Sequence, residues 1–510
     1  MTSSSRKSIE PSTAEPVRHS PLSKAEIRSI FYGLMVGMFL SALNQTIVVT
    51  ALPTIGREFG DFENLSWVII AYLLSSTVVS PLYGKLSDIH GRRVMMLLAI
   101  GLFLAGSVVS AAAPNMAILI AGRTLQGIGG GGIVPLTQTT IADMITARER
   151  GRYQAYMGTS WIMAGLAGPA LGGAIAEYLH WSVIFWLNVP LGVVATLLVH
   201  HAMKRLPRHE RPHRLDVIGA ALMTSAATIF LIALTSGGTR VPWLSSTIFA
   251  LVAVSLGLSL AFVWWLRLAP EPFLPLTVLG NPVMRAGTAA TSWMLGAVLG
   301  LTVYMPLYFQ VVHGLSATEA GLALIPIVLM TTPGSMLSGR SMMYLRHYKV
   351  SAIGGATIAI ASVTALAIDP AMPLLGVIIA LTLIGFGAGT VYPVATVSIQ
   401  NAVPAHQVGT ATGAMNFFRA LASALAVAIM GAILLAALGA TPERGTGVEL
   451  LVETARAAGL DIAVAFRFAF VAVDAFLVAA LAAVLLMEER PLRGPASGPA
   501  SAEAPPAPAE

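Results

Sequence analysis

The sequence contains no cysteine among its 510 residues. This absence excludes a disulfide scaffold, a thiolate metal site and a cysteine nucleophile. Charged residues are also scarce, since Asp, Glu, Lys and Arg make up 11% of the chain, against about 25% in ordinary soluble proteins. Hydrophobic residues reach 56%, and the mean hydropathy is +0.77. A soluble chain cannot hide that much apolar surface, so the composition predicts an integral membrane protein in a lipid bilayer.

Motifs that would indicate an enzyme or a nucleic-acid-binding protein are missing too. No G-x-x-x-x-G-K-[ST] loop occurs, so ATP hydrolysis by this chain is not the expected source of energy. The apolar stretches hold no His/Glu cluster at metal-ligand spacing and no Ser/His pair, which disfavours an intramembrane enzyme. The net charge of +6 comes from basic residues between the apolar stretches. We therefore expect no enzymatic activity, no cofactor, no bound metal and no nucleic-acid partner.

Fourteen stretches are long and apolar enough for a membrane-spanning helix, which needs about 20 residues. They are continuously apolar and do not alternate at every second residue, which indicates helices and not barrel strands. The predicted fold class is therefore an all-α integral membrane protein with 14 transmembrane helices. The predicted spans are 28–53, 65–86, 93–113, 116–140, 153–177, 181–202, 215–235, 247–267, 285–311, 318–340, 350–369, 372–398, 407–438 and 463–487.

The basic residues predict the orientation of these spans. An even number of spans places both termini on the same side of the membrane. That side, with every second gap, holds 24 of the 30 Lys and Arg residues, Arg419 among them, whereas the opposite side holds five and Arg123 lies inside a span. Basic residues favour the cytoplasmic side. We therefore expect a multi-pass protein of the cell membrane with both termini in the cytoplasm.

The gap between the second and third spans carries a distinctive motif, Gly84-Lys85-Leu86-Ser87-Asp88-Ile89-His90-Gly91-Arg92-Arg93. Gly91 suits a tight hairpin, and Asp88 with the two arginines can join neighbouring helix ends by charge-assisted hydrogen bonds. The string resembles the signature loop of the major facilitator superfamily, G-x-L-a-D-r-x-G-r-r. The resemblance implies two six-helix halves that rock around a central cavity.

With this resemblance the chain divides into five segments. The helical segments are an N-terminal six-helix bundle at 28–203, a basic linker with two inserted transmembrane helices at 204–284, and a C-terminal six-helix bundle at 285–490. Residues 1–27 are polar, and 491–510 are rich in Pro and Ala. Both ends are expected to be disordered cytoplasmic tails.

Two aspartates are expected to form a cytoplasmic gate. Asp88 and Asp143 both lie at cytoplasmic helix ends. Arg92 and Arg148 are their expected partners.

The fourth span contains Arg123. An arginine inside a span costs about 2.5 to 3.5 kcal/mol on insertion scales and marks a functional position by default. Helix rise places Arg123 at about the same depth as the polar residues Asn44, Gln45 and Thr46 of the first span, so we expect these residues to meet. The alternative is that Arg123 reaches outward to lipid headgroups. The segment from Arg123 through Gly129 also resembles the superfamily motif R-x-x-q-G-x-g, in which the arginine is associated with proton transfer.

The fifth span carries the string Gly165, Gly168, Pro169, Gly172 and Gly173. Gly165, Gly168 and Gly172 are spaced to give one flat stripe for another helix, and Pro169 removes a backbone donor. Close packing alone would account for the glycines. The combined string resembles the antiporter motif of exporters in the superfamily, which implies outward transport.

The first and sixth spans narrow the resemblance. The segment 43–53 is similar to L-D-x-T-I-V-n-x-A-L-P, a pattern of the fourteen-span drug:proton antiporters, and the segment 181–192 is similar to a second pattern of that family. One departure matters, because the family aspartate is Asn44 here. An amide can hydrogen-bond but cannot carry a proton or pair with a cationic drug.

Asp474 is the only acid predicted deep in a span, about 16 Å from its external end. With Arg123, it is our candidate for proton coupling. The alternative is a structural pair with a basic or hydroxyl side chain.

We expect an apolar substrate cavity that suits lipophilic, aromatic molecules. Each aromatic side chain among the predicted lining residues can equally face lipid or another helix. The predicted lining residues are Asn44, Gln45, Thr46, Gln126, Trp161, Trp293, Tyr304 and Tyr392.

The predicted function is proton-coupled export of small lipophilic compounds, such as drugs or antibiotics, by a monomer that works by alternating access. One alternative is an exporter of a lipid or of a single defined metabolite, with Asn44 reflecting a neutral or anionic cargo. Another is a transport-inactive membrane receptor or scaffold.

Overall fold

The computed structural model describes residues 23–205, 215–238, 241–437 and 462–492. Within these ranges, 14 helices are long and apolar enough to cross a membrane, which confirms the predicted number of spans. The predicted tails and linker lie largely outside the described residues, which do not include 1–22, 206–214 and 493–510.

The helices begin and end close to the predicted positions. In chain order they are α1 (Lys24–Phe59), α2 (Trp67–His90), α3 (Arg92–Ala111), α4 (Met116–Met144), α5 (Ala147–Tyr178), α6 (Val183–Trp186), α7 (Asn188–Ala202), α8 (Val217–Ser236), α9 (Ser246–Leu268), α10 (Leu276–Leu279), α11 (Pro282–Val312), α12 (Ala317–Leu322), α13 (Ile325–Leu329), α14 (Thr331–Tyr344), α15 (Lys349–Ile368), α16 (Leu374–Ala402), α17 (Val408–Ala437) and α19 (Ile462–Leu486).

The start of α1 differs from the prediction. The helix begins at Lys24 and not at residue 28. The Ser23 hydroxyl accepts a hydrogen bond from the Glu26 backbone N–H, and the Glu26 carboxylate accepts one from the Ser23 N–H. This capping box stabilises the earlier start.

Two predicted spans are interrupted. The span 181–202 is divided between α6 and α7, and the span 318–340 is divided among α12, α13 and α14. Pro190 and Pro326 lie at the first turns of α7 and α13. Because proline has no N–H, neither residue can continue the hydrogen-bond pattern of the preceding helix.

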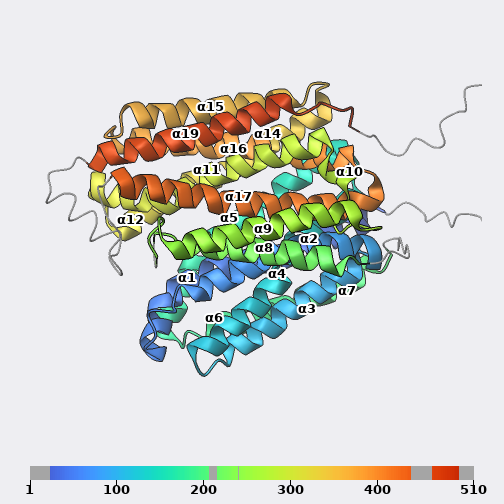
Figure 1. Ribbon diagram of the computed structural model, residues 1–510, viewed down its shortest axis with the longest axis horizontal. Coiled ribbons are helices and arrows are strands. Elements are labelled where there is room, and N and C mark those ends of the chain that lie inside the picture. The colour runs from blue at the N-terminus through green and yellow to red at the C-terminus, as the bar shows by residue number, and fades with distance from the viewer. Residues whose placement is uncertain (1–22, 206–214, 239–240, 438–461, 493–510) are drawn as a thin grey trace, which may run out of the picture.

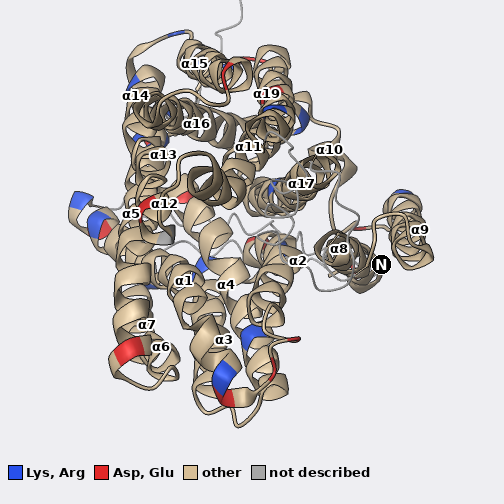
Figure 2. Cartoon of the chain, turned by 90° about the vertical axis from the view of Figure 1, so that its left-hand side faces the viewer, with Lys and Arg blue, Asp and Glu red and all other residues tan. Residues whose placement is uncertain are grey.

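The helices form two bundles with an added pair at the seam between them (Figures 1 and 2). In the N-terminal bundle, α1 packs against α5 and α7, and α4 packs against α2 and α3. In the C-terminal bundle, α16 packs against α14 and α15, and α11 packs against α17 and α19. The inserted helices α8 and α9 pack against each other, and α8 also contacts α2 and α17.

The two bundles contact each other mainly through α2 with α17 and α5 with α14, and less extensively through α4 with α17 and α5 with α16. The contacts are closest at one end of the molecule, which we call the basic end because it carries the segments 85–93, 145–152 and 340–349. Here a Cβ atom on Gly84 of α2 would overlap the carbonyl oxygen of Gly409 of α17, and one on Gly151 of α5 would lie 2.7 Å from the Cα of Gly339 of α14. Glycine at these positions therefore lets the backbones approach closely.

Candidate functional site: a central cavity with one closed end

A cavity of about 1230 Å³ lies between the two bundles. Its walls come from α1, α2, α4 and α5 of the N-terminal bundle, from α11, α14, α16 and α17 of the C-terminal bundle, and from α8. Most lining side chains are apolar. Among the described residues that line it, Arg419 is the only charged one, and none is Asp, Glu, Lys or His.

Four of the eight residues predicted to line the cavity do so. They are Gln45, Trp161, Tyr304 and Tyr392. Trp161 of α5 leaves 37% of its surface exposed. The Tyr304 hydroxyl donates a 3.4 Å hydrogen bond to the carbonyl of Val427.

The other four predicted lining residues, Asn44, Thr46, Gln126 and Trp293, do not line it. The Thr46 hydroxyl donates to the carbonyl of Ala164 at 2.9 Å, which uses it at the contact between α1 and α5. Trp293 stacks on Phe476 of α19, with ring centroids 5.5 Å apart. These side chains point into the bundles because they find hydrogen-bonding or aromatic partners there.

Arg123 lies inside the N-terminal bundle, where only 1% of its surface is exposed. Its Nε donates to the carbonyl of Val68 at 2.8 Å, and its Nη1 donates to Oε1 of Gln126 at 2.7 Å. The guanidinium also lies over the ring of Tyr72, 4.5 Å from the centroid. The alternative in which Arg123 reaches the headgroups is therefore wrong. Within the described chain, no carboxylate forms an ion pair with Arg123.

Gln126 connects Arg123 to Asn44. Its Nε2 donates to Oδ1 of Asn44 at 3.2 Å and to the hydroxyl of Ser107 at 2.7 Å. Asn188 of α7 donates to the same Asn44 oxygen at 3.2 Å. Of the predicted cluster, Arg123 thus reaches only Asn44, and does so through Gln126. The Asn44 Nδ2 is buried and has no partner among the described residues.

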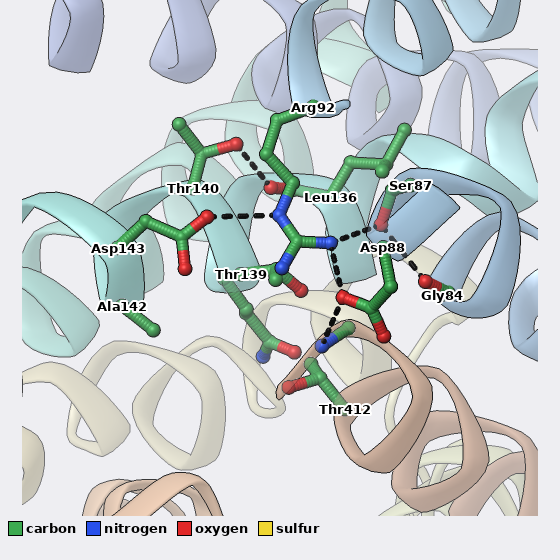
Figure 3. Close-up of polar contacts among 12 residues, drawn as sticks. Gly84, Ser87, Asp88, Arg92, Leu136, Thr139, Thr140, Ala142, Asp143 and Thr412 are labelled. Atoms are coloured by element: carbon green, nitrogen blue, oxygen red, sulfur yellow. Dashed lines mark hydrogen bonds and ion pairs between the residues drawn. The ribbon is translucent and has the colours of Figure 1, made fainter. Parts of the chain in front are cut away.

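The signature loop builds a cluster of charges at the basic end, shown in Figure 3. Arg92 lies between two carboxylates, with Nη1 2.6 Å from Oδ1 of Asp88 and Nε 2.8 Å from Oδ2 of Asp143. Gly91 allows this arrangement because its φ of 88° lies in the left-handed region between α2 and α3.

Asp88 also reaches across the seam to the first turn of α17. Its carboxylate accepts hydrogen bonds from the backbone N–H of Gly409 at 3.1 Å, the backbone N–H of Thr410 at 2.7 Å and the Thr410 hydroxyl at 2.7 Å. A carboxylate is favourable there because the first N–H groups of a helix lack intrahelical partners and carry partial positive charge. We call Asp88, Arg92, Asp143, Gly409 and Thr410 the Asp88 cluster.

The other arginines of the predicted gate have different positions. Arg93 approaches the His200 ring of α7, with Nη2 3.2 Å from Nδ1. Arg148 is exposed and does not pair with Asp88 or Asp143. The arginine two residues further on contacts the end of α4 instead, because Arg150 Nε donates to the carbonyl of Ile145 at 2.9 Å.

A second group of cross-seam contacts forms the floor of the cavity. Nδ2 of Asn416 donates to Oε1 of Gln138 at 2.8 Å, and Nε2 of Gln400 lies 3.5 Å from the carbonyl of Gln138. Arg419 donates to Oδ1 of Asn416 at 2.6 Å. These contacts were not predicted from the sequence, in which Arg419 counts as a cytoplasmic residue. Its position in the sequence was the available signal, because Arg419 lies twelve residues after the start of the predicted span 407–438.

The antiporter string lies on α5 against α1. A Cβ on Gly168 would overlap the Thr46 hydroxyl, and one on Gly172 would overlap the Thr50 hydroxyl. Neither Gly165 nor Gly173 has a neighbour within 4 Å of a built Cβ. The predicted stripe is therefore corrected to Ala164, Gly168 and Gly172, which follow one another at intervals of four residues and so share one face. Pro169, inside α5, is exposed.

Asp474 lies near the middle of α19 and does not line the cavity. Its carboxylate accepts a hydrogen bond from the hydroxyl of Thr364 on α15, with oxygen distances of 3.3 and 3.2 Å. This is the hydroxyl partner that the structural alternative expects. The α15–α19 contact lies at the side of the C-terminal bundle remote from the N-terminal bundle (Figure 2).

The cavity is closed at the basic end. Across the described residues, every hydrogen bond that joins the two bundles involves Ser80, Asp88 or Gln138 of the N-terminal bundle. All three precede the basic end of α2 or α4 by no more than ten residues, or about 15 Å. The lining reaches the opposite end at Gly238 and Leu435.

Comparison with known proteins identifies relatives over most of the chain. A family model described as the Major Facilitator Superfamily matches residues 34–427. Efflux pump FUS6 of Gibberella moniliformis is 32% identical over 437 residues, which cover 82% of this chain and 76% of the relative. Multidrug transporter protein MdtP of Bacillus subtilis is 30% identical over 405 residues, which cover 79% of this chain and 74% of the relative.

A solved structure supports the same fold. The crystal structure of the human organic anion transporter MFSD10 (TETRAN) matches with a TM-score of 0.63 and 18% sequence identity, and the match covers 91% of this chain and 100% of that chain.

Proposed function

Because this chain belongs to the major facilitator superfamily, and is thus a membrane transporter, we propose that it exports small lipophilic compounds by alternating access. The observation that carries the proposal is a large, mostly apolar cavity between two bundles. Hydrogen bonds between the bundles close this cavity at the basic end. The names of FUS6 and MdtP, an efflux pump and a multidrug transporter, support export. A cavity formed by both bundles of one chain is consistent with a monomeric transporter.

Transport by purified protein in liposomes tests this proposal. A panel of lipophilic dyes is scored for movement that requires the protein. Trp161→Ala removes an aromatic wall of the cavity and is expected to change the order in which the dyes are transported. Trp264→Ala on α9 is the matched control, because Trp264 does not line the cavity and is 63% exposed. Equal effects of both substitutions, or no protein-dependent transport of any dye, would contradict the proposal.

We also propose that export is coupled to proton entry and that Asp474 and Arg123 take part. The described lining contains no carboxylate, so a coupling carboxylate must act from outside the cavity. Asp474 is the described acid nearest the middle of a span. Since it bonds to Thr364, a change in its protonation would alter the contact between α15 and α19.

Two variants separate titration of Asp474 from its hydrogen bond. Asp474→Asn keeps a hydrogen-bonding group but cannot be ionised, so we expect it to abolish dependence of dye transport on a pH gradient. Thr364→Val removes the hydroxyl donor and keeps the carboxyl group, so gradient dependence should persist. Gradient-driven transport that survives in Asp474→Asn would remove Asp474 from the coupling mechanism.

We further propose that the protein lies in the cell membrane with its basic end in the cytoplasm. The excess of basic residues at that end supports this orientation. Because the natural chain has no cysteine, His90→Cys at the basic end and Asp61→Cys at the other end each create a unique label site. In intact cells, an impermeant maleimide is expected to label only the Asp61→Cys protein, and the reverse pattern would invert the topology.

A further inference from the structure

Arg419 places one positive charge inside the cavity, about halfway across the membrane. It lies eleven residues after Val408, the first residue of α17, or about 16 Å from the basic end. It lines the cavity and is the only charged residue among the described lining. No carboxylate in the described part of the chain forms an ion pair with it. The arginine side chain does not lose its proton in proteins, so this charge is permanent.

Most of the hydrogen-bonding capacity of Arg419 is unused. A guanidinium group has five N–H donors in a fork that matches a carboxylate. In the structure one nitrogen, Nη2, donates to Asn416, and no other described group accepts from this side chain. The remaining donors are therefore available to a molecule in the cavity.

Two more donors lie in the same cavity without partners. The Tyr392 hydroxyl of α16 is buried and has no hydrogen bond among the described residues, and the same holds for Nε2 of Gln154 on α5. Both residues line the cavity, and Tyr392 is close enough to Arg419 to interact with it electrostatically. Buried polar groups in native proteins normally have partners, so these atoms indicate a ligand with hydrogen-bond acceptors.

The rest of the lining defines the body of such a ligand. Trp161, Leu299 and Tyr304 belong to a wall that is mainly apolar. A cationic compound would meet an uncompensated positive charge and no acidic partner. An anionic compound would find charge-assisted, bidentate hydrogen bonds for its charged group and apolar surface for the remainder.

We propose that Arg419 and Tyr392 form an anion-binding subsite, and that the preferred substrates are lipophilic organic monoanions with a carboxylate or sulfonate group. This inference rests on the proposed function, because it specifies the substrate class of the same cavity. Arg419 binds the anionic group, the Tyr392 hydroxyl donates to it, and the apolar wall holds the hydrophobic body.

Three dansyl compounds test the charge preference with one fluorophore. Dansylglycine is an anion, dansylglycine methyl ester is neutral and dansylcadaverine is a cation. Binding of each to the purified full-length protein is measured by fluorescence titration. Charged hydrogen bonds are strong enough to favour the anion over the ester by about 10-fold to 100-fold. A wild-type protein that prefers the cation, or that does not distinguish the three compounds, would overturn the proposal.

Substitutions locate the preference. Arg419→Gln is expected to abolish the preference for dansylglycine while the affinity for the ester changes less than about threefold, and Arg419→Lys should retain part of it because the charge remains. Tyr392→Phe should weaken binding of the anion by about fivefold. Arg267→Gln, which changes an exposed arginine of α9 outside the cavity, is the control and should leave all three affinities unchanged.

The ester also reports whether the variants fold. If Arg419→Gln still binds the ester but retains the preference for the anion, Arg419 is not the anion site. If Arg419→Gln weakens the binding of the anion and of the ester equally, the arginine serves the structure and the proposal is wrong.

Failure of the subsite and failure of export are distinguishable. Preferential binding of the anion without protein-dependent transport of any compound would support the subsite and contradict the proposed export. Transport of neutral or cationic dyes without anion preference would do the opposite.

Discussion

Asp88→Asn is expected to shift the transporter away from the conformation that is closed at the basic end. Asp88 makes three hydrogen bonds to α17 across the seam, two to backbone N–H groups and one to the Thr410 hydroxyl. Hydrogen bonds to a charged group contribute about 1.5 to 3 kcal/mol, whereas neutral ones contribute about 0.5 to 1.5 kcal/mol. Asparagine has one acceptor oxygen and a donor N–H₂ group in place of the other, so at least one of these bonds is lost and the others become neutral. Together these changes weaken the closed state by about 3 kcal/mol or more. At 1.4 kcal/mol per factor of ten, the ratio of closed to open molecules falls about 100-fold or more.

Distance measurement between two spin labels detects this shift. His90 at the end of α2 and His406 just before α17 are exposed and lie on opposite sides of the seam. Cysteines at these positions are the only label sites, because the chain has no other cysteine. We expect Asp88→Asn to move the distance distribution toward longer values.

Asp61→Asn provides the control for that experiment. Asp61 bonds to Asn64 in its own loop at the opposite end. An unchanged distribution in Asp88→Asn, or an equal shift in the control, would show that the charge of Asp88 does not hold the two bundles together.

Three further predictions concern close packing and buried polar groups. Gly84→Ala should also lengthen the label distance, because its Cβ would overlap Gly409, whereas Gly101→Ala has free space and should leave the distance unchanged. Gly168→Ala should lower the thermal midpoint of the purified protein by forcing α5 away from α1, whereas Gly165→Ala should have no such effect because its Cβ meets nothing within 4 Å. Asn44→Asp should raise the thermal midpoint, because it removes an unpaired buried N–H₂ group and adds a negative charge that Gln126 links to Arg123. A lower midpoint would contradict the hydrogen-bond network of Asn44, Gln126 and Arg123.

The fold was predictable because the membrane imposes a simple length and hydrophobicity requirement on each helix. All fourteen spans were located from apolar runs alone, with ends shifted by a few residues. The larger differences have local causes. The capping box at Ser23 extends α1, and proline divides two of the spans at α7 and α13.

The residues of the site were harder to predict because position along a helix fixes depth but not direction. Asn44 and Gln45 are neighbours at nearly the same depth, yet Gln45 lines the cavity and Asn44 faces Gln126. Successive side chains on a helix point about 100° apart, so one residue decides between the cavity and the bundle interior. The partners of Asp88 could not be predicted from the sequence for another reason. Thr410 lies 322 positions away, and no local pattern relates the two.

Arg419 illustrates how depth and charge together carry functional information. As one of the basic residues, it supported the predicted orientation of the chain. Its distance from the end of the helix places it near the middle of the membrane. There its Nη2 donates to Asn416, and Asn416 in turn donates to Gln138 of the other bundle. An anion bound to the remaining donors of Arg419 would therefore share the guanidinium group with Asn416. The proposed subsite is thus one hydrogen bond away from a contact that joins the bundles at the closed end. This hydrogen bond connects the substrate site to the gate, and alternating access requires such a connection.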